Sequence, residues 1–282
     1  MCGIIGITSK TSVAAELHTG LVNLQHRGQD STGIATYNGR FHVVRGVGYV
    51  REAYSLQSLT SLEGTVGIGQ TRYSTSGSAY DVENAQPFLV NSPYGIALVH
   101  NGNLTNHREL RLELQVNDHF HCNSDSDTET LLGVFATELS RASATDDFFD
   151  MVCQAVAQVY KRVHGGYSVV GVIAGKGMFA FRDPHGIRPL VWGSRQSEGN
   201  EYIFASENSP FAPLGFAYGG DVGAGELVFV ETGGVMKRKK LVNKEFTPDV
   251  FEYIYFARPD ALINQVSVYR ARLRMGQNLA KR

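Results

Sequence analysis

The order of apolar patterns along the chain is the feature that most restricts its fold. Apart from one early helical segment, strand-like runs come first, helical periodicity follows, and strands return from Tyr167 to about Glu231. Turns such as Asn38-Gly39, in which both residues tolerate positive φ, are typical of antiparallel hairpins. Such segregated blocks favour an α+β protein over an alternating parallel α/β sheet. We therefore predict largely antiparallel sheets.

Four segments have the three- and four-residue apolar spacing of amphipathic helices. They span residues 13–24, 106–115, 130–139 and 149–163. The polar residues 8–12 and Asn106 precede the first two segments, and we expect them to cap those helices. Cys153 lies beside the apolar stripe of the last segment and is therefore predicted to be a buried core thiol.

A change in sequence texture near residue 245 suggests a domain boundary. The chain of 282 residues exceeds the usual size of one domain. Beyond Pro248 comes an aromatic run, and residues 266–282 form a basic, helix-prone tail. We predict a first domain at residues 1–245 and the start of a second at residues 246–282. The second part is too short to bury its own core, so it should dock on the first or begin something longer.

Composition excludes several classes of partner. The formal net charge is −1, so we expect no general attraction to nucleic acid or to an anionic membrane. The basic run at residues 237–240 follows Gly233-Gly234 and is interpreted as the solvated end of a hairpin. Three widely spaced cysteines argue against a disulfide framework or a zinc site. No apolar run approaches the ~20 residues that span a bilayer, and no signal peptide is evident, so we expect a cytoplasmic protein.

Cys2 directly precedes an apolar strand punctuated by glycines. If Met1 is removed, Cys2 carries both a thiol and a free α-amine. An amine that titrates near pH ~8 is closer to neutrality than a lysine, so it could serve as the base that activates the thiol. The alternative is a small buried residue in an edge strand. The position of Cys2 alone leaves both interpretations open.

Three further polar clusters lie in loops beside strands, where site residues are usually presented. Arg72 ends a predicted strand and is suited to gripping a carboxylate. Asn101 and Gly102 offer a side-chain amide and a backbone N–H, the donor pair that an oxyanion requires. Asp127 precedes a helix and could bind an ammonium group.

Taken singly, each cluster has an ordinary structural explanation. These are a surface ion pair for Arg72, a turn for Asn101-Gly102 and an N-cap for Asp127. Together with Cys2, they are the parts needed to cleave the side-chain amide of an amino acid held by its two α-groups.

Eight motifs carry a resemblance to a known family. CGIIGI (residues 2–7), LQHRGQDSTGI (24–34), GQTRYSTSG (69–77), HNGNL (100–104) and SDTE (126–129) resemble, in this order, the class II glutamine amidotransferases, which are N-terminal-nucleophile hydrolases. NAQPF (84–88), FRDPHGIRPL (181–190) and FEYIYFARPD (251–260) are similar to the amidophosphoribosyltransferase family within that class. The resemblance covers the whole chain and implies a four-layer αββα sandwich.

The resemblance implies a reaction and the residues that perform it. Cys2, exposed by loss of Met1, would attack the side-chain amide of glutamine, and its own α-amine would relay protons to the departing ammonia. Asn101 and Gly102 would hold the oxyanion. A glutamyl thioester would form and water would release glutamate.

The resemblance also implies the residues that bind glutamine. Arg72 would bind its α-carboxylate with Thr75 nearby, and Asp127 its α-ammonium group. Arg27 and Gly28, in the HRG loop, would shape the wall beside the nucleophile.

A second domain in this family binds phosphoribosyl pyrophosphate with Mg²⁺ and receives the ammonia. Residues 246–282 would then begin a truncated phosphoribosyltransferase domain. No Asp-Asp stretch followed by a glycine-rich turn occurs here, so the chain alone is expected to hydrolyse glutamine without making phosphoribosylamine. No propeptide precedes Cys2 and the cysteines match no cluster pattern, so neither a propeptide nor an iron–sulfur cluster is expected, nor any other metal in this part. The full-length protein is expected to be a homo-oligomer.

Two alternatives to this assignment remain. The glutaminase half of a hexosamine-phosphate or asparagine synthetase would share the site motifs but would leave FEYIYFARPD unexplained. An inactive regulatory or assembly module is the alternative without catalysis, because an isolated glutaminase domain can rest in a poorly active conformation.

Overall fold

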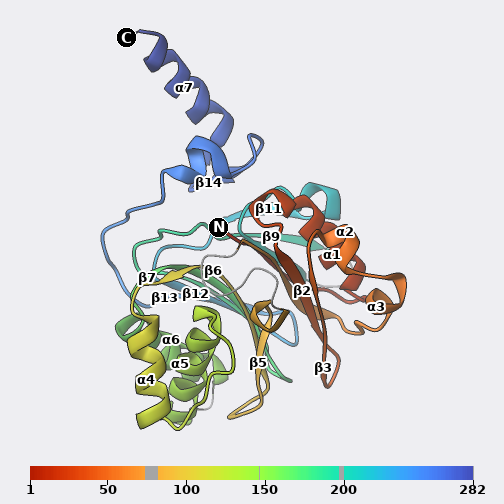
Figure 1. Ribbon diagram of the computed structural model, residues 1–282, viewed down its shortest axis with the longest axis vertical. Coiled ribbons are helices and arrows are strands. Elements are labelled where there is room, and N and C mark those ends of the chain that lie inside the picture. The colour runs from red at the N-terminus through yellow and green to blue at the C-terminus, as the bar shows by residue number, and fades with distance from the viewer. Residues whose placement is uncertain (74–81, 146, 197–199, 282) are drawn as a thin grey trace.

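The computed structural model describes residues 1–73, 82–145, 147–196 and 200–281. The described strands of the main body form two antiparallel sheets (Figure 1). The seven-stranded sheet contains, in spatial order, β11 (Ala217–Asp221), β9 (Val191–Gln196), β10 (Asn200–Ala205), β1 (Gly3–Thr8), β4 (Val66–Arg72), β2 (Ser31–Tyr37) and β3 (Phe41–Val47). The six-stranded sheet contains β13 (Met236–Lys240), β12 (Glu226–Glu231), β8 (Gly177–Arg182), β7 (Gly165–Ile173), β6 (Ile96–Leu104) and β5 (Phe88–Val90).

Helices cover the outer face of each sheet. On the seven-stranded sheet these are α1 (Ala14–Asn23), α2 (Val50–Ala53) and α3 (Leu56–Thr60). On the six-stranded sheet they are α4 (His107–Asn117), α5 (Asp127–Arg141) and α6 (Phe148–Arg162). Figure 1 shows the resulting order of helices, sheet, sheet and helices. The predicted α+β class and the four-layer αββα arrangement are therefore confirmed.

The pattern of β1 explains how the layers are held together. Ile5 and Ile7 belong to the apolar core under α1, whereas Ile4 belongs to the core between the two sheets. This is the period of two expected of a strand that is buried on both faces. A Cβ at Gly6 would lie 2.5 Å from Val170 Cγ1, so glycine is what lets the two sheets approach here.

The predicted hairpin at Asn38-Gly39 and the buried thiol are confirmed. β2 pairs with β3 around this turn, and β5 also pairs with β6. The basic run lies in β13, which pairs with β12 beyond the Gly233-Gly234 turn. Cys153 is buried in the core under α5 and α6.

The predicted caps of the first two long helices are wrong. Val13 is at the N-cap of α1, and no side chain caps that helix. Ser9 instead donates a hydrogen bond to Glu201 at 2.8 Å. Asn106 is at the N-cap of α4 without a capping bond, because its amide donates to the carbonyl of Arg162 and accepts from the N–H of His164. Residues distant in the sequence bind the polar side chains that the local sequence pattern would assign to helix capping.

The C-terminal segment packs against loops and strand ends of both sheets and then leaves the body. It contains the π-helical turn η4 (Glu252–Phe256), a hairpin of β14 (Leu262–Ile263) and β15 (Val266–Ser267), and α7 (Val268–Ala280), which projects away from both sheets (Figure 1). Its own core is only Ala257, Ala261, Ile263 and Val268, with Tyr253 against it. The docking is as expected, and the boundary near residue 245 stays a prediction.

No helix in the described part of the chain is both long and apolar enough to cross a membrane.

Candidate active site

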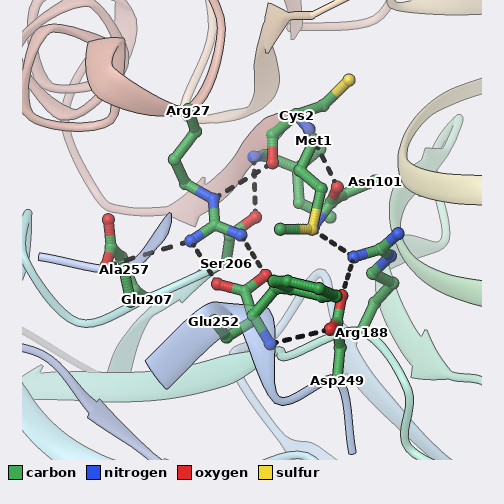
Figure 2. A network of polar contacts seen from close by, with 12 residues as sticks. Met1, Cys2, Arg27, Asn101, Arg188, Ser206, Glu207, Asp249, Glu252 and Ala257 are labelled. Carbon is green, nitrogen blue, oxygen red and sulfur yellow. Dashed lines mark hydrogen bonds and ion pairs between the residues drawn. The ribbon is translucent and has the colours of Figure 1, made fainter. Parts of the chain in front are cut away.

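Cys2 directly precedes β1 of the seven-stranded sheet and lies beside β6 of the six-stranded sheet. Its side chain is nearly buried, with 9% exposure, and its Sγ lies 3.7 Å from the carbonyl oxygen of Tyr73. Its backbone N–H donates to Oδ1 of Asn101 at 3.0 Å, as Figure 2 shows. Since Asn101 belongs to β6, this bond joins the nucleophile candidate of one sheet to the other sheet.

The oxygen of the Asn101 side-chain amide forms a hydrogen bond, and its nitrogen has no described hydrogen-bond partner. Its Oδ1 accepts from Cys2, which fixes the orientation of the amide. Its Nδ2 is buried and has no hydrogen-bond partner among the described residues. A buried donor without a partner is unusual and calls for an explanation, such as a ligand atom that it is placed to meet.

Gly102 follows Asn101 in a position that only glycine can occupy. Its φ is +156°, and a Cβ would collide with the carbonyl oxygen of Gly166 and lie 2.7 Å from Nε2 of His100. The Asn101-Gly102 pair is therefore part of β6 and not the turn that was its structural alternative.

A buried polar network supports this part of β6. The His100 N–H donates to Gln86 at 2.6 Å, and the carbonyl of His100 accepts from Gln70 at 2.8 Å. Gln86 also donates to the Thr128 hydroxyl, which lies 3.1 Å from Nδ1 of His100. Burial lowers the pKa of His100, so its imidazole is neutral near pH 7. The network joins the NAQPF, HNGNL and SDTE motifs, and the supporting roles of Gln86 and Thr128 were not predicted from the sequence.

Asp127 is the first residue of α5 and is not its N-cap. Ser126 takes that place, with Oγ accepting from the N–H of Thr128. Oδ2 of Asp127 accepts from the N–H of Leu104 on β6, and Oδ1 lies 3.8 Å from Nδ1 of His100. The structure thus places a nearly buried carboxylate beside the strand that carries Asn101.

Arg72 is the last residue of β4, the strand that pairs with β1. The register sets Thr71 opposite Gly3, which brings Arg72 next to Cys2. Its side chain is 4% exposed, so it is not the surface residue that an ordinary ion pair would require. Thr75, its predicted neighbour, lies outside the described residues.

Arg27 is fully buried, and its guanidinium is held by protein groups (Figure 2). It forms a bidentate ion pair with Glu252 and also donates to the carbonyl of Cys2. Arg27 therefore contributes to the wall beside the nucleophile without offering a free cation. Glu252 lies within the FEYIYFARPD motif, but no sequence signal distinguished this acidic residue from its aromatic neighbours.

Gly28 packs directly against the end of β4. A Cβ there would lie 2.5 Å from the carbonyl carbon of Arg72 and 2.7 Å from its oxygen. We expect Gly28→Ala to displace Arg72 or the HRG loop and to lower the free energy of unfolding by about 1–3 kcal/mol. Thermal unfolding measures the change. Gly233→Ala is the control, because its Cβ would meet nothing within 4 Å; a Gly28→Ala protein with an ordinary Tm would contradict the expectation.

Electrostatics at the N-terminus favour neutral groups. Burial lowers the pKa of the Met1 amine, and the cationic Arg188 and Arg27 lower it further. Burial also raises the pKa of the Cys2 thiol, outweighing the opposite effects of the nearby amine and of Arg72. A buried terminal amine is thus a neutral base at a lower pH than an exposed one.

A cavity of about 570 Å³ opens beside Met1. Its lining includes Met1, Tyr73, His26, residues 28–30, and residues 255–259 of the C-terminal segment. In the described part of the chain, no group of three or more His, Cys, Asp or Glu side chains is arranged to hold a metal ion.

Comparison with known proteins identifies the class. The profile of a family described as a glutamine amidotransferase domain matches residues 72–213. The chain belongs to this family and is a class II glutamine amidotransferase domain.

The relatives within that class are specific. Amidophosphoribosyltransferase of Pseudomonas aeruginosa is 45% identical over 99% of this chain and 56% of its own length. The amidophosphoribosyltransferase of Escherichia coli is 44% identical over 100% of this chain and 57% of its own length. The solved glutamine phosphoribosylpyrophosphate amidotransferase from B. subtilis, complexed with ADP and GMP, superposes with a TM-score of 0.85 at 30% identity, covering 99% of this chain and 58% of that one. The chain thus spans little more than half the length of these relatives.

Proposed function

We propose that this chain, once Met1 is removed, hydrolyses glutamine to glutamate and ammonia through a thioester on Cys2. The observation that carries the proposal is the Asn101 amide. Its Oδ1 already accepts a hydrogen bond from the nitrogen of Cys2, and its buried Nδ2 has no described partner. One side chain would therefore orient the α-amine and stabilise the oxyanion at the same time.

The reaction follows from these positions. The α-amine takes the thiol proton, and the Cys2 sulfur attacks the side-chain carbonyl of glutamine. Asn101 and Gly102 bind the oxyanion of the tetrahedral intermediate. The C–N bond then breaks, the amine returns the proton, and ammonia leaves. Water attacks the thioester, which releases glutamate and restores the thiol.

Removal of Met1 is a requirement of this mechanism. With Met1 attached, the nitrogen of Cys2 is a peptide N–H, which has no lone pair available to accept a proton. After excision the same nitrogen becomes the α-amine, 3.0 Å from its acceptor on Asn101.

A direct assay tests the proposal. The chain is incubated with glutamine, glutamate and ammonia are quantified, and intact mass establishes the first residue. We expect equal amounts of both products from the processed chain and none from a chain that retains Met1. Absence of hydrolysis by fully processed protein would overturn the proposal and favour the inactive regulatory or assembly module.

Arg72 and Asp127 would bind the α-carboxylate and the α-ammonium group of glutamine, with Thr75 near the former. We expect Arg72→Ala to raise KM by about 10- to 100-fold with a smaller change in kcat, because a charge-assisted hydrogen bond is lost equally from ground and transition states. Arg72→Lys should recover part of the loss, since lysine keeps the charge but not the planar fork. Arg40→Ala, at an exposed arginine, is the control; an unchanged KM in Arg72→Ala would refute the clamp.

The use of the ammonia is a further proposal, supported by the named relatives. We propose that in the full-length protein it reacts with phosphoribosyl pyrophosphate, bound with Mg²⁺ by a domain that begins in residues 246–282, to form 5-phosphoribosylamine for purine biosynthesis. No iron–sulfur cluster is proposed. The gene sequence beyond Arg282 tests this: a sugar-isomerase or adenylating domain there would favour another class II amidotransferase.

A further inference from the structure

A fully enclosed ion pair lies directly beneath the nucleophile candidate. Nη1 of Arg27 lies 3.0 Å from Oε2 of Glu252, and Nη2 lies 2.6 Å from Oε1. The two side chains are 0% and 1% exposed. The remaining guanidinium nitrogen, Nε, donates to the carbonyl oxygen of Cys2 at 3.1 Å (Figure 2).

Stability alone is a poor explanation for this pair. Removing two charges from water is costly, and replacing a buried pair by well-packed apolar side chains is often neutral or stabilising. Apolar side chains cannot reproduce the hydrogen bond from Nε of Arg27 to the carbonyl oxygen of Cys2. Because the guanidinium is planar and Glu252 grips two of its nitrogens, the direction of the Nε–H bond is fixed. The carbonyl of Cys2 is therefore held at a position set by Glu252.

Cys2 is thus held at both ends of its backbone. Asn101 on β6 accepts from its nitrogen, and Arg27 donates to its carbonyl. In Figure 2 the sulfur points away from the Arg27–Glu252 pair. Arg27 acts on the thiol through the backbone of Cys2 and not by direct contact with it.

Glu252 in turn depends on how the C-terminal segment docks. Carboxylate and amide oxygens of the body accept backbone N–H groups from that segment: Glu207 from Arg258 at 3.0 Å, and Asn208 from Leu262 at 2.8 Å. These bonds hold the residues that follow the Glu252 turn against the body, and Glu252 contacts Arg27, which in turn contacts Cys2.

We propose that Arg27 is a positioning residue for Cys2 and Glu252 its anchor, so that glutamine hydrolysis requires residues 252–264 to be docked. This inference rests on the proposed glutaminase function. It predicts that breaking the pair slows the chemical step and leaves glutamine binding nearly unchanged, because the three guanidinium nitrogens of Arg27 already bind Glu252 and the carbonyl of Cys2.

The main test replaces both members with methionine, which fills similar volume without charge. We expect the Arg27→Met, Glu252→Met protein to lose about 10- to 100-fold in kcat and to keep KM within about twofold, as misplacement of a reacting group does. Buried Glu207 loses its ion pair with Arg27 in this variant but keeps its contacts with His26 and with the N–H of Arg258. Labelling of Cys2 by a diazoketone analogue of glutamine should slow by a similar factor. A doubly substituted protein with ordinary kcat and ordinary labelling would overturn the inference.

Two further variants keep the test decisive. Glu252→Gln preserves shape, and we expect it to fold and to lose kcat even if the double variant does not fold; ordinary kcat in Glu252→Gln would overturn the inference. Arg195→Met, Glu201→Met is the matched control, because that pair lies at the far end of β1 and should leave kcat unchanged. If the unsubstituted, processed chain neither hydrolyses glutamine nor is labelled at Cys2, the proposed function is wrong. If that chain is active and the Arg27 and Glu252 variants are fully active as well, only the present inference is wrong.

Discussion

Cys2→Ala is expected to reduce glutamine hydrolysis by at least about four orders of magnitude, because no other described group in the site supplies a nucleophile. The variant removes only one sulfur atom from a small, nearly buried side chain, so its Tm should stay close to that of the parent. The measurement is glutamate release at saturating glutamine. Glutamine binding, followed by calorimetry, should persist, since the proposed clamps, Arg72 and Asp127, remain.

The matched control for this substitution is Cys153→Ala. Cys153 is also a buried thiol, but it lies in the core beneath α6, away from the site. It should keep full activity. A chain carrying an uncleavable extra residue before Cys2 should be as inactive as Cys2→Ala, since it keeps the thiol and loses the amine. A Cys2→Ala protein that retains a tenth of the activity would place the nucleophile elsewhere.

Asn101→Ala is expected to lower kcat by about 100- to 1000-fold, the usual cost of losing one oxyanion donor. That variant also removes the acceptor of the Cys2 nitrogen. Asn101→Asp keeps an acceptor for that nitrogen, but it exchanges the donating Nδ2 for an oxygen and adds a negative charge beside the oxyanion. We expect Asn101→Asp to lose at least as much kcat, with KM changed far less than kcat.

Asn103→Ala is the control on the same strand, because that side chain is exposed and has the same chemistry. It should leave both kinetic constants unchanged. If Asn101→Asp instead keeps kcat within a few-fold of the parent, Nδ2 does not bind the oxyanion, and the unpartnered donor requires another explanation.

Local sequence patterns predicted much of this fold. The hairpin at Asn38-Gly39 and the two-faced pattern of β1 follow from residues within a few positions of one another, because turn conformation and strand periodicity are local properties. The failed caps at Ser9 and Asn106 mark the limit of such reasoning. A polar side chain near a helix start has several competing acceptors and donors, and distant segments supplied the ones that were used.

The sequence predicted which residues form the candidate site, and the structure added the contacts between them. Arg72, Asn101, Gly102 and Asp127 were predicted from motifs, and the structure brings these residues around Cys2. Their roles remain predictions for the experiments above. Thr75 lies outside the described residues.

The sequence by itself determined the class of fold and the identity of the reactive groups, because periodicity and residue chemistry are written locally. Only the tertiary structure decided which groups meet. Asn101 bonds to a nitrogen 99 positions earlier in the chain, and Arg27 pairs with a carboxylate 225 positions later. No local pattern encodes such pairs, since they arise when two sheets and a docked segment bring distant residues together. The orientation of the Asn101 amide and the link from Glu252 to Cys2 are properties of that assembly.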